Sequence, residues 1–160
     1  TFIAPESNKP SYVHIGRDVV TAEADALHDL AKSLNHLFDD AISLIAQTQG
    51  RLIVSGIGKS GHIGRKIAAT FASTGQPSLF VHPAEASHGD LGMIAKGDVL
   101  LLISYSGESK ELNTIIDYCH RLALPIISIT GEEQSTLARF SAVSLVLPKM
   151  VEACPMGLAP

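Results

Sequence analysis

The stretch RLIVSGIGKSGHIG, residues Arg51 to Gly64, decides the fold. It opens with an apolar run typical of a buried strand, and its glycines form a turn that leads into a helical pattern. At such a strand-to-helix turn, backbone N–H groups and the helix dipole create a site for an anion. The stretch therefore predicts an α/β fold with a phosphate site. That phosphate could belong to a dinucleotide, a nucleoside triphosphate or a phosphorylated sugar.

Short apolar runs then alternate with helical patterns along the rest of the chain. Strands separated by helical crossovers predict a parallel sheet that is covered on both faces. In such a sheet the ligand lies at the carboxyl ends of the strands, where the strand order reverses. We expect five strands, at 51–55, 78–82, 99–104, 126–130 and 143–147, and helical segments at 60–73, 109–122 and 135–140, with a short turn within 84–93.

The chain before this sheet predicts a long amphipathic helix. Apolar residues recur at three- and four-residue steps from Asp18 to Gln49, as one helix or two in series, with Gly50 as the stop. We expect residues 1–16 to form an arm that either docks on another surface or stays loose. We expect residues 17–160 to form the domain. The helix is longer than a small sheet needs, so part of its apolar stripe is expected to pack against a partner chain.

The composition fits one domain without disulfides. Of the 160 residues, 46% are hydrophobic and 5% aromatic, which is usual for a parallel sheet built from Ile, Leu, Val and Ala. A net charge of -4 argues against nucleic acid as the main partner. No apolar run reaches the roughly 18 residues of a membrane span, and no signal peptide is visible, so we expect no membrane partner and a cytoplasmic location. Cys119 and Cys154 lack CxxC spacing and predict ordinary thiols.

Two nucleotide interpretations of the glycine turn are weak. Gly56, Gly58 and Gly61 satisfy the dinucleotide spacing, but no acidic residue ends the second strand to hold a ribose. A nucleoside triphosphate loop would need glycine where Ile53 lies. The plain alternative is a turn whose glycines permit positive φ, with Lys59 merely solvated.

The serine-rich stretch SYSGES, Ser104 to Ser109, follows the third strand. Three hydroxyls and a glycine there can converge on a phosphate at the start of the next helix. The plain alternative is a helix cap, although a cap needs only one hydroxyl. Glu108 is expected to face away from a bound phosphate because the two charges repel. Glu111, one turn farther into the helix, could reach a substrate or a subunit boundary, or it could serve only the helix.

The loop HPAEASHGD, His82 to Asp90, brings two histidines to the end of the second strand. Their separation on a loop neither supports nor excludes a metal, and we expect none. Either histidine could shuttle protons or simply bond to the loop backbone. Glu152 follows the last strand and is expected at the same rim of the sheet, with an exposed linker glutamate as the alternative.

Four motifs in order resemble the sugar isomerase (SIS) domain of bacterial D-arabinose 5-phosphate isomerases: GIGKSGHIGRKIAATFASTG, HPAEASHGDLGMI, ISYSGESKEL and EACPMGLAP. The resemblance covers nearly all of residues 17–160 and implies a flavodoxin-like, three-layer α/β domain with a phosphosugar site. It implies phosphate binding by Ser60, Ser104, Ser106 and Ser109, with backbone from the loop at Gly58. It also implies active-site roles for Lys59, His88, Glu111 and Glu152.

The resemblance further implies an activity and an assembly. Members of the family interconvert ribulose 5-phosphate and arabinose 5-phosphate through an enediol, the first step towards the Kdo sugar of lipopolysaccharide. They act as homotetramers without a nucleotide cofactor. Members also continue beyond the equivalent of Pro160 with another active-site histidine and a pair of CBS domains, so we expect this chain to be a truncated form.

Two rival functions remain. A sugar isomerase domain can serve as a phosphosugar-binding regulatory module without catalysis, although such regulators carry a DNA-binding domain in front. Hexulose 6-phosphate isomerases share the fold, but we do not expect their loops to carry EASHGDLGM.

Overall fold

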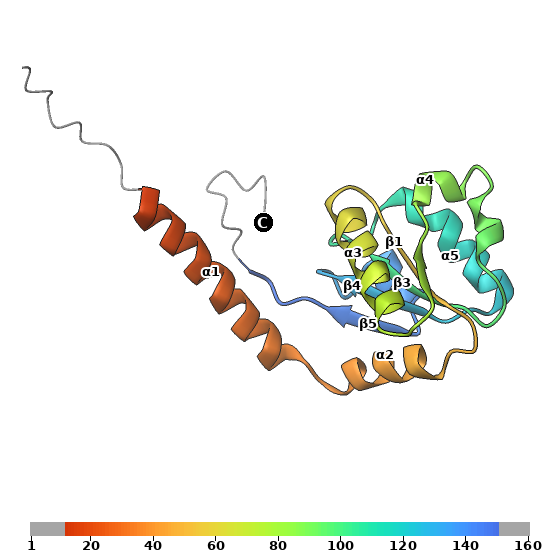
Figure 1. The fold of residues 1–160 in the computed structure, drawn as a ribbon, viewed down its shortest axis with the longest axis horizontal. Helices are drawn as coiled ribbons and strands as arrows, with labels where there is room; N and C mark the ends of the chain where they lie inside the picture. Colours follow the sequence, from red (N-terminus) through yellow and green to blue (C-terminus); the bar gives the residue numbers. More distant parts are fainter. Residues whose placement is uncertain (1–11, 151–160) are drawn as a thin grey trace, which may run out of the picture. The chain divides into compact units, whose positions relative to one another are not determined.

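The computed structural model describes residues 12–150. The chain divides into two units, one that ends at Ser33 and resumes at Lys149, and one that spans Leu34–Pro148. Each unit is described by itself. The larger unit contains the sheet and the flanking helices (Figure 1).

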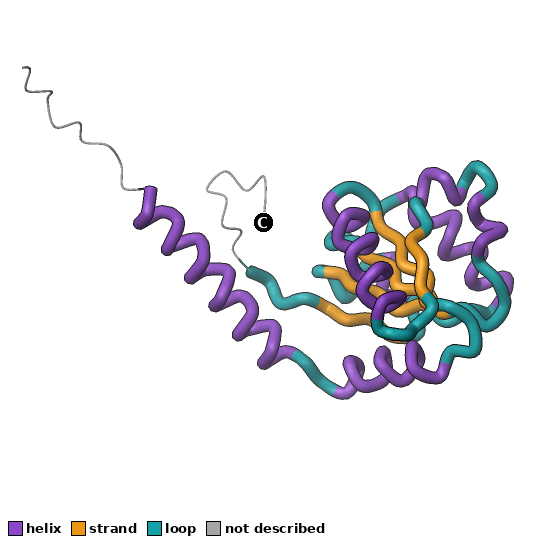
Figure 2. Tube along the Cα trace, viewed as in Figure 1, coloured by secondary structure: helices purple, strands orange, loops and turns teal. Residues whose placement is uncertain are grey.

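A five-stranded, all-parallel sheet forms the centre of the larger unit (Figure 2). The strand order is β2-β1-β3-β4-β5, and every neighbouring pair is parallel. This confirms the predicted α/β class and places each strand within two residues of its expected bounds. The strands are β1 (Leu52–Gly56), β2 (Ser78–Phe80), β3 (Val99–Ile103), β4 (Ile126–Thr130) and β5 (Val143–Val146).

The strand order reverses between β1 and β3. From β1 the chain moves outward to β2 and then crosses back to place β3 on the other side of β1. Gly56, the last residue of β1, is the register partner of Ile103, the last residue of β3. The loops that follow these two strands therefore start side by side, at the place where such sheets bind ligands.

Helices cover both faces of the sheet, and the strand side chains alternate between two cores. Leu52 and Val54 point to the face covered by α2 (His36–Gln47) and α3 (Lys59–Ser73). Ile53 points to the opposite face. That second core is closed by α4 (Pro83–Ala86), α5 (Lys110–Leu122) and α6 (Thr136–Arg139), while the 3-10 turn η1 (Asp90–Met93) follows α4.

The predicted long helix is two helices in series. α1 (Tyr12–Ser33) ends before Asn35, whose side chain accepts a 2.9 Å hydrogen bond from the N–H of Leu37 and caps α2. α1 begins at Tyr12, so the end of the predicted arm is helical, while residues 1–11 lie outside the described part. α2 ends at Gln47 with Thr48 as its cap. Gly50 lies beyond that cap, and its N–H donates a 3.0 Å hydrogen bond to the Gly97 carbonyl.

Most large apolar side chains of α1 are exposed in the single chain. None of its residues is buried, and Tyr12, Val13 and Val20 are each at least 65% exposed. Between residues 12 and 150, none of the helices combines the length and apolar character needed to cross a membrane.

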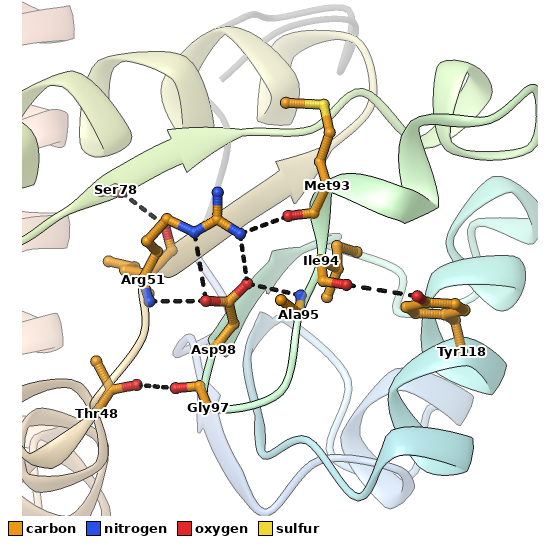
Figure 3. Close-up of polar contacts among 10 residues, drawn as sticks. Thr48, Arg51, Ser78, Met93, Ile94, Ala95, Gly97, Asp98 and Tyr118 are labelled. Atoms are coloured by element: carbon orange, nitrogen blue, oxygen red, sulfur yellow. Dashed lines mark hydrogen bonds and ion pairs between the residues drawn. The ribbon is translucent and has the colours of Figure 1, made fainter.

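A partly buried ion pair joins the segments that enter β1 and β3 (Figure 3). Asp98 is 2% exposed, and its carboxylate accepts hydrogen bonds from the backbone N–H groups of Arg51 at 2.8 Å and Ala95 at 2.9 Å. The Arg51 guanidinium donates to the same carboxylate at 3.0 Å and to the Met93 carbonyl at 2.6 Å. Burial alone would raise the pKa of Asp98, but the bonds from Ala95 and Arg51 outweigh it and hold that pKa below its usual value. The pair thus fastens the amino ends of the two strands whose carboxyl ends carry the site.

Candidate functional site

The glycine turn opens α3 at the carboxyl end of β1. Gly58 is the cap residue of α3 and has φ of 59°, a left-handed conformation that favours glycine. Intrahelical hydrogen bonds begin with the N–H groups of Gly61 and His62. The positive end of the helix dipole therefore lies at Lys59 and Ser60, of which Lys59 is exposed and Ser60 half-buried.

The serine loop forms a compact hydrogen-bonded cluster at the end of β3. The hydroxyls of Ser104 and Ser109 lie 2.8 Å apart. The Gly107 N–H donates to the Ser104 hydroxyl at 3.2 Å, and the Glu108 N–H donates to the Ser106 hydroxyl at 3.3 Å. All three serines therefore have their hydroxyls ordered by the loop itself.

The simple helix-cap interpretation does not account for this cluster. Ser109 occupies the cap position of α5, but its side chain makes no hydrogen bond to the backbone of that helix. Its hydroxyl instead meets that of Ser104, which is 4% exposed. A hydroxyl held away from its own helix is available to a ligand at the helix start, where the dipole favours an anion.

The structure brings the predicted phosphate residues to one edge of the sheet. Gly58 and Ser60 follow β1, while Ser104, Ser106 and Ser109 follow its neighbour β3. Two helix N-termini, those of α3 and α5, begin at this edge. The combined field is favourable to a phosphate, and Lys59 lies in the first turn of α3.

The Glu108 carboxylate bonds to α6, which agrees with the prediction that it turns away from a bound phosphate. Its carboxylate accepts a 2.7 Å hydrogen bond from the N–H of Thr136, at the start of α6. That backbone hydrogen bond, with a further one from the Thr136 side chain, lowers the pKa of Glu108, and Arg139 contributes in the same direction. The carboxylate is therefore kept ionised without pointing into the serine cluster.

The four predicted catalytic residues lie on different elements. Lys59 begins α3, and Glu111 lies exposed in the first turn of α5. His88 is exposed on the segment after α4, and its backbone N–H donates to the Glu85 carbonyl at 2.9 Å. Glu152 lies outside the described residues, so the structure does not place it beside the other three.

The other histidine of this loop has a backbone role. The Nδ1 atom of His82 accepts a 3.3 Å hydrogen bond from the N–H of Ala84 and caps α4. The plain interpretation is thus confirmed for His82. Within residues 12–150, no group of three or more His, Cys, Asp or Glu side chains is arranged to hold a metal ion.

The loop after β4 supports the serine loop, and sequence reasoning named no site residue in it. The Tyr105 carbonyl accepts hydrogen bonds from the Gly131 N–H at 2.8 Å and from the Thr130 hydroxyl at 3.1 Å. The feature that could have pointed to this loop is its position at the carboxyl edge of the sheet, because β4 is the neighbour of β3.

The matched family agrees with this geometry. The family model described as SIS domain matches residues 44–160, which include the glycine turn, the serine loop and the strands between them. The chain belongs to the SIS domain family. The match begins within α2, so α1 lies outside the matched residues.

Curated relatives of this SIS domain include two arabinose 5-phosphate isomerases. KdsD of Escherichia coli K12 is 50% identical over 145 residues, which is 91% of this chain and 44% of that protein. KdsD of Pseudomonas aeruginosa is 46% identical over 154 residues, which is 96% of this chain and 47% of that protein. The chain therefore spans less than half the length of these relatives.

A solved structure gives the same fold. The structure of E. coli CFT073 c3406 in complex with A5P superposes with a TM-score of 0.90 at 41% identity, covering 96% of this chain and 81% of that one.

Proposed function

We propose that this SIS domain is the catalytic domain of an arabinose 5-phosphate isomerase, which interconverts D-ribulose 5-phosphate and D-arabinose 5-phosphate. The observation that carries the proposal is the pair of hydroxyls of Ser104 and Ser109, held 2.8 Å apart at the switch point of the sheet. Relatives that are about 50% identical to this chain are named arabinose 5-phosphate isomerases. The solved structure that is 41% identical is a complex with A5P.

The sugar phosphate is proposed to bind through its phosphate at the two helix starts. In this arrangement the hydroxyls exchange the bonds between themselves for bonds to phosphate oxygens, while the N-terminus of α3 supplies positive potential. We assign phosphate binding to the residues named from the sequence, which are Gly58, Ser60, Ser104, Ser106 and Ser109.

The isomerisation needs a base, a proton carrier and a group that stabilises an enediolate. A base removes the proton from C2 of the open-chain aldose or from C1 of the ketose, and the electron pair moves onto the carbonyl oxygen. A proton returned to the other carbon completes the exchange. We assign the base to Glu111 or Glu152, the proton carrier to His88 and stabilisation of the enediolate oxygens to Lys59. No cofactor takes part in this proposed scheme.

The proposal extends to assembly, location and pathway. Exposed apolar side chains on α1 and on α2, where Phe38 is 40% and Ile42 45% exposed, support packing against further copies, and we propose a homotetramer. The product would feed Kdo and lipopolysaccharide biosynthesis. The enzyme would then act in the cytoplasm on a sugar phosphate and not on nucleic acid or a membrane.

Isotope exchange tests the activity. Ribulose 5-phosphate is incubated in D2O with this chain and, in parallel, with a version extended through the following segments of its relatives. Arabinose 5-phosphate carrying deuterium at C2, detected by proton NMR, is the expected product of an enediol route. If neither protein forms it while ribulose 5-phosphate still shifts protein resonances, the domain is a binding module and the enzyme proposal is wrong.

Replacement of Lys59 tests the assigned chemistry. Lys59→Ala should lower kcat, because the enediolate loses a stabilising positive charge. Lys66→Ala, an exposed lysine farther along α3, is the matched control and should retain activity. If Lys59→Ala stays within about threefold of the unmodified protein, a loss below roughly 1 kcal/mol, the role given to Lys59 is wrong.

A further inference from the structure

We propose that Glu108 is a positioning residue for the serine loop, and that it sets the shape of the phosphate site by bonding to the start of α6. This inference rests on the proposed function, because it concerns how the same loop receives a sugar phosphate. Glu108 is not proposed to touch the substrate.

The first turn of α6 receives two of its hydrogen-bond acceptors from the serine loop. The first N–H groups of a helix lack partners within that helix. In α6, the N–H of Thr136 donates to the Glu108 carboxylate at 2.7 Å, and that of Leu137 donates to the Gly107 carbonyl at 3.0 Å. The next N–H group is satisfied by the helix's own cap residue, Ser135. Glu108 thus completes a set of bonds that a cap residue alone does not supply.

The serine loop lies so close to this turn that only glycine fits at position 107. Gly107 has φ of 64°, and a Cβ placed on it would lie 2.1 Å from the Ser135 hydroxyl oxygen and 2.3 Å from the Ser135 Cβ. Ser135 is 4% exposed and its hydroxyl caps α6, so moving it aside would break that cap. The backbone on the N-terminal side of Glu108 is therefore fixed against α6, which limits where its carboxylate can reach.

Anchored residues and serines share the loop between β3 and α5. Tyr105 bonds to the end of β4 and the residue after it, and Gly107 and Glu108 bond to the first turn of α6. Ser104, Ser106 and Ser109 instead direct their hydroxyls into the loop itself. Any shift of the anchored residues would move the hydroxyls beside them. The side chain of Glu108 is the anchor that a substitution can remove without changing the backbone.

The charge of Glu108 makes its direction important for binding. A carboxylate next to a phosphate-binding loop would repel the ligand if it turned inward. At the start of α6 the same charge meets the N–H donor of Thr136, and Arg139 attracts it as well. The lowered pKa of Glu108 agrees with this placement, because the Thr136 bonds favour the ionised form. The bond to α6 therefore keeps a negative charge out of the site while fixing the loop.

Three variants of the full chain test the inference. Glu108→Ala removes the acceptor, Glu108→Gln keeps an acceptor oxygen without the charge, and Glu133→Ala removes an exposed charge from the neighbouring loop as a control. The readouts are KM and kcat for arabinose 5-phosphate, the affinity for inorganic phosphate by NMR titration, and amide hydrogen exchange in residues 104–109.

The expected pattern separates positioning from chemistry. Glu108→Ala should raise KM and weaken inorganic phosphate binding by about twofold to tenfold, because the ligand must then order the loop without the net stabilisation that one hydrogen bond gives. Its kcat should change less than KM, since phosphate binding is shared by ground and transition states. Exchange at 104–109 should speed up, Glu108→Gln should recover part of each effect, and Glu133→Ala should match the unmodified protein.

The contrary results are equally definite. If Glu108→Ala binds inorganic phosphate as tightly as the unmodified protein, or if only kcat falls, the positioning role is overturned. Exchange and phosphate titration need no turnover, so they still decide the matter if the isomerase activity is absent. An unmodified protein that binds phosphate but isomerises nothing would contradict the proposed function alone.

Discussion

Asp98→Ala should destabilise the domain without altering its substrate affinity. The substitution removes the acceptor for the backbone N–H groups of Arg51 and Ala95, which Asp98 binds while 2% exposed. A buried donor left unsatisfied costs about 1–3 kcal/mol. The Arg51 side chain is 38% exposed and can turn to water, so its guanidinium adds little. Because both amides bond to the same carboxylate, water that fills its place can satisfy part of their need, and we expect a total loss of about 3 kcal/mol.

Chemical and thermal unfolding measure this loss. For a chain of this size, about 3 kcal/mol corresponds to a fall in Tm of roughly 6–12 °C. Asp117→Ala, an exposed aspartate on α5, is the matched control and should change stability by less than about 0.5 kcal/mol. A loss below about 1 kcal/mol for Asp98→Ala would refute the reasoning, and so would a large change in KM, because the ion pair lies at the amino ends of β1 and β3.

The pH dependence supplies an independent check of the same pair. The folded-state pKa of Asp98 lies below its unfolded value, so its contribution is complete above the unfolded pKa of about 4. As the pH falls through the lower, folded-state pKa, the carboxylate is protonated and that contribution is lost. The stability difference between the unmodified protein and Asp98→Ala should therefore be constant near neutrality and shrink below about pH 4.

Three further substitutions test other parts of the fold. Ser55→Ala should cost about 1 kcal/mol in denaturant unfolding, because the buried hydroxyl of Ser55 donates a 2.7 Å hydrogen bond to the Val81 carbonyl; an unchanged midpoint would contradict this. Gly50→Ala should lower the free energy of unfolding by about 1–3 kcal/mol, since the added Cβ would lie 2.5–2.6 Å from atoms of Gly97 and Asp98. An unchanged free energy of unfolding would contradict this close packing. Burial raises the pKa of Cys119 to about 12. In a protein whose other cysteine is removed by Cys154→Ser, a thiol reagent should therefore label Cys119 only after unfolding, and rapid labelling of the folded protein would refute the burial of Cys119.

The sheet and the edge that carries the candidate site could be predicted because they depend on patterns close together in the sequence. Apolar runs between helical patterns gave all five strands, and the glycine and serine stretches each directly follow one of them. The break between α1 and α2 also has a local cause, the cap at Asn35, and the sequence pattern left one helix or two open.

Contacts between distant loops could not be predicted in the same way. The bond from Thr136 to Glu108 and the pair of Arg51 with Asp98 depend on which strands become neighbours. Repulsion from a phosphate predicted that Glu108 would turn away, but nothing local specified α6 as its partner. The exchange of a cap bond at Ser109 for a bond to Ser104 is likewise set by the folded loop.

The direct pairing of β1 with β3 has a consequence for synthesis of the chain on the ribosome. The glycine turn is made first, and the serine loop follows about 50 residues later, or roughly 3–10 seconds at ordinary rates of synthesis. The last anchor, at the start of α6, emerges later still. A nascent chain therefore carries the first of the two loops assigned to the proposed phosphate site without the second, and the contacts that anchor the second loop form only after the first turn of α6 has been made.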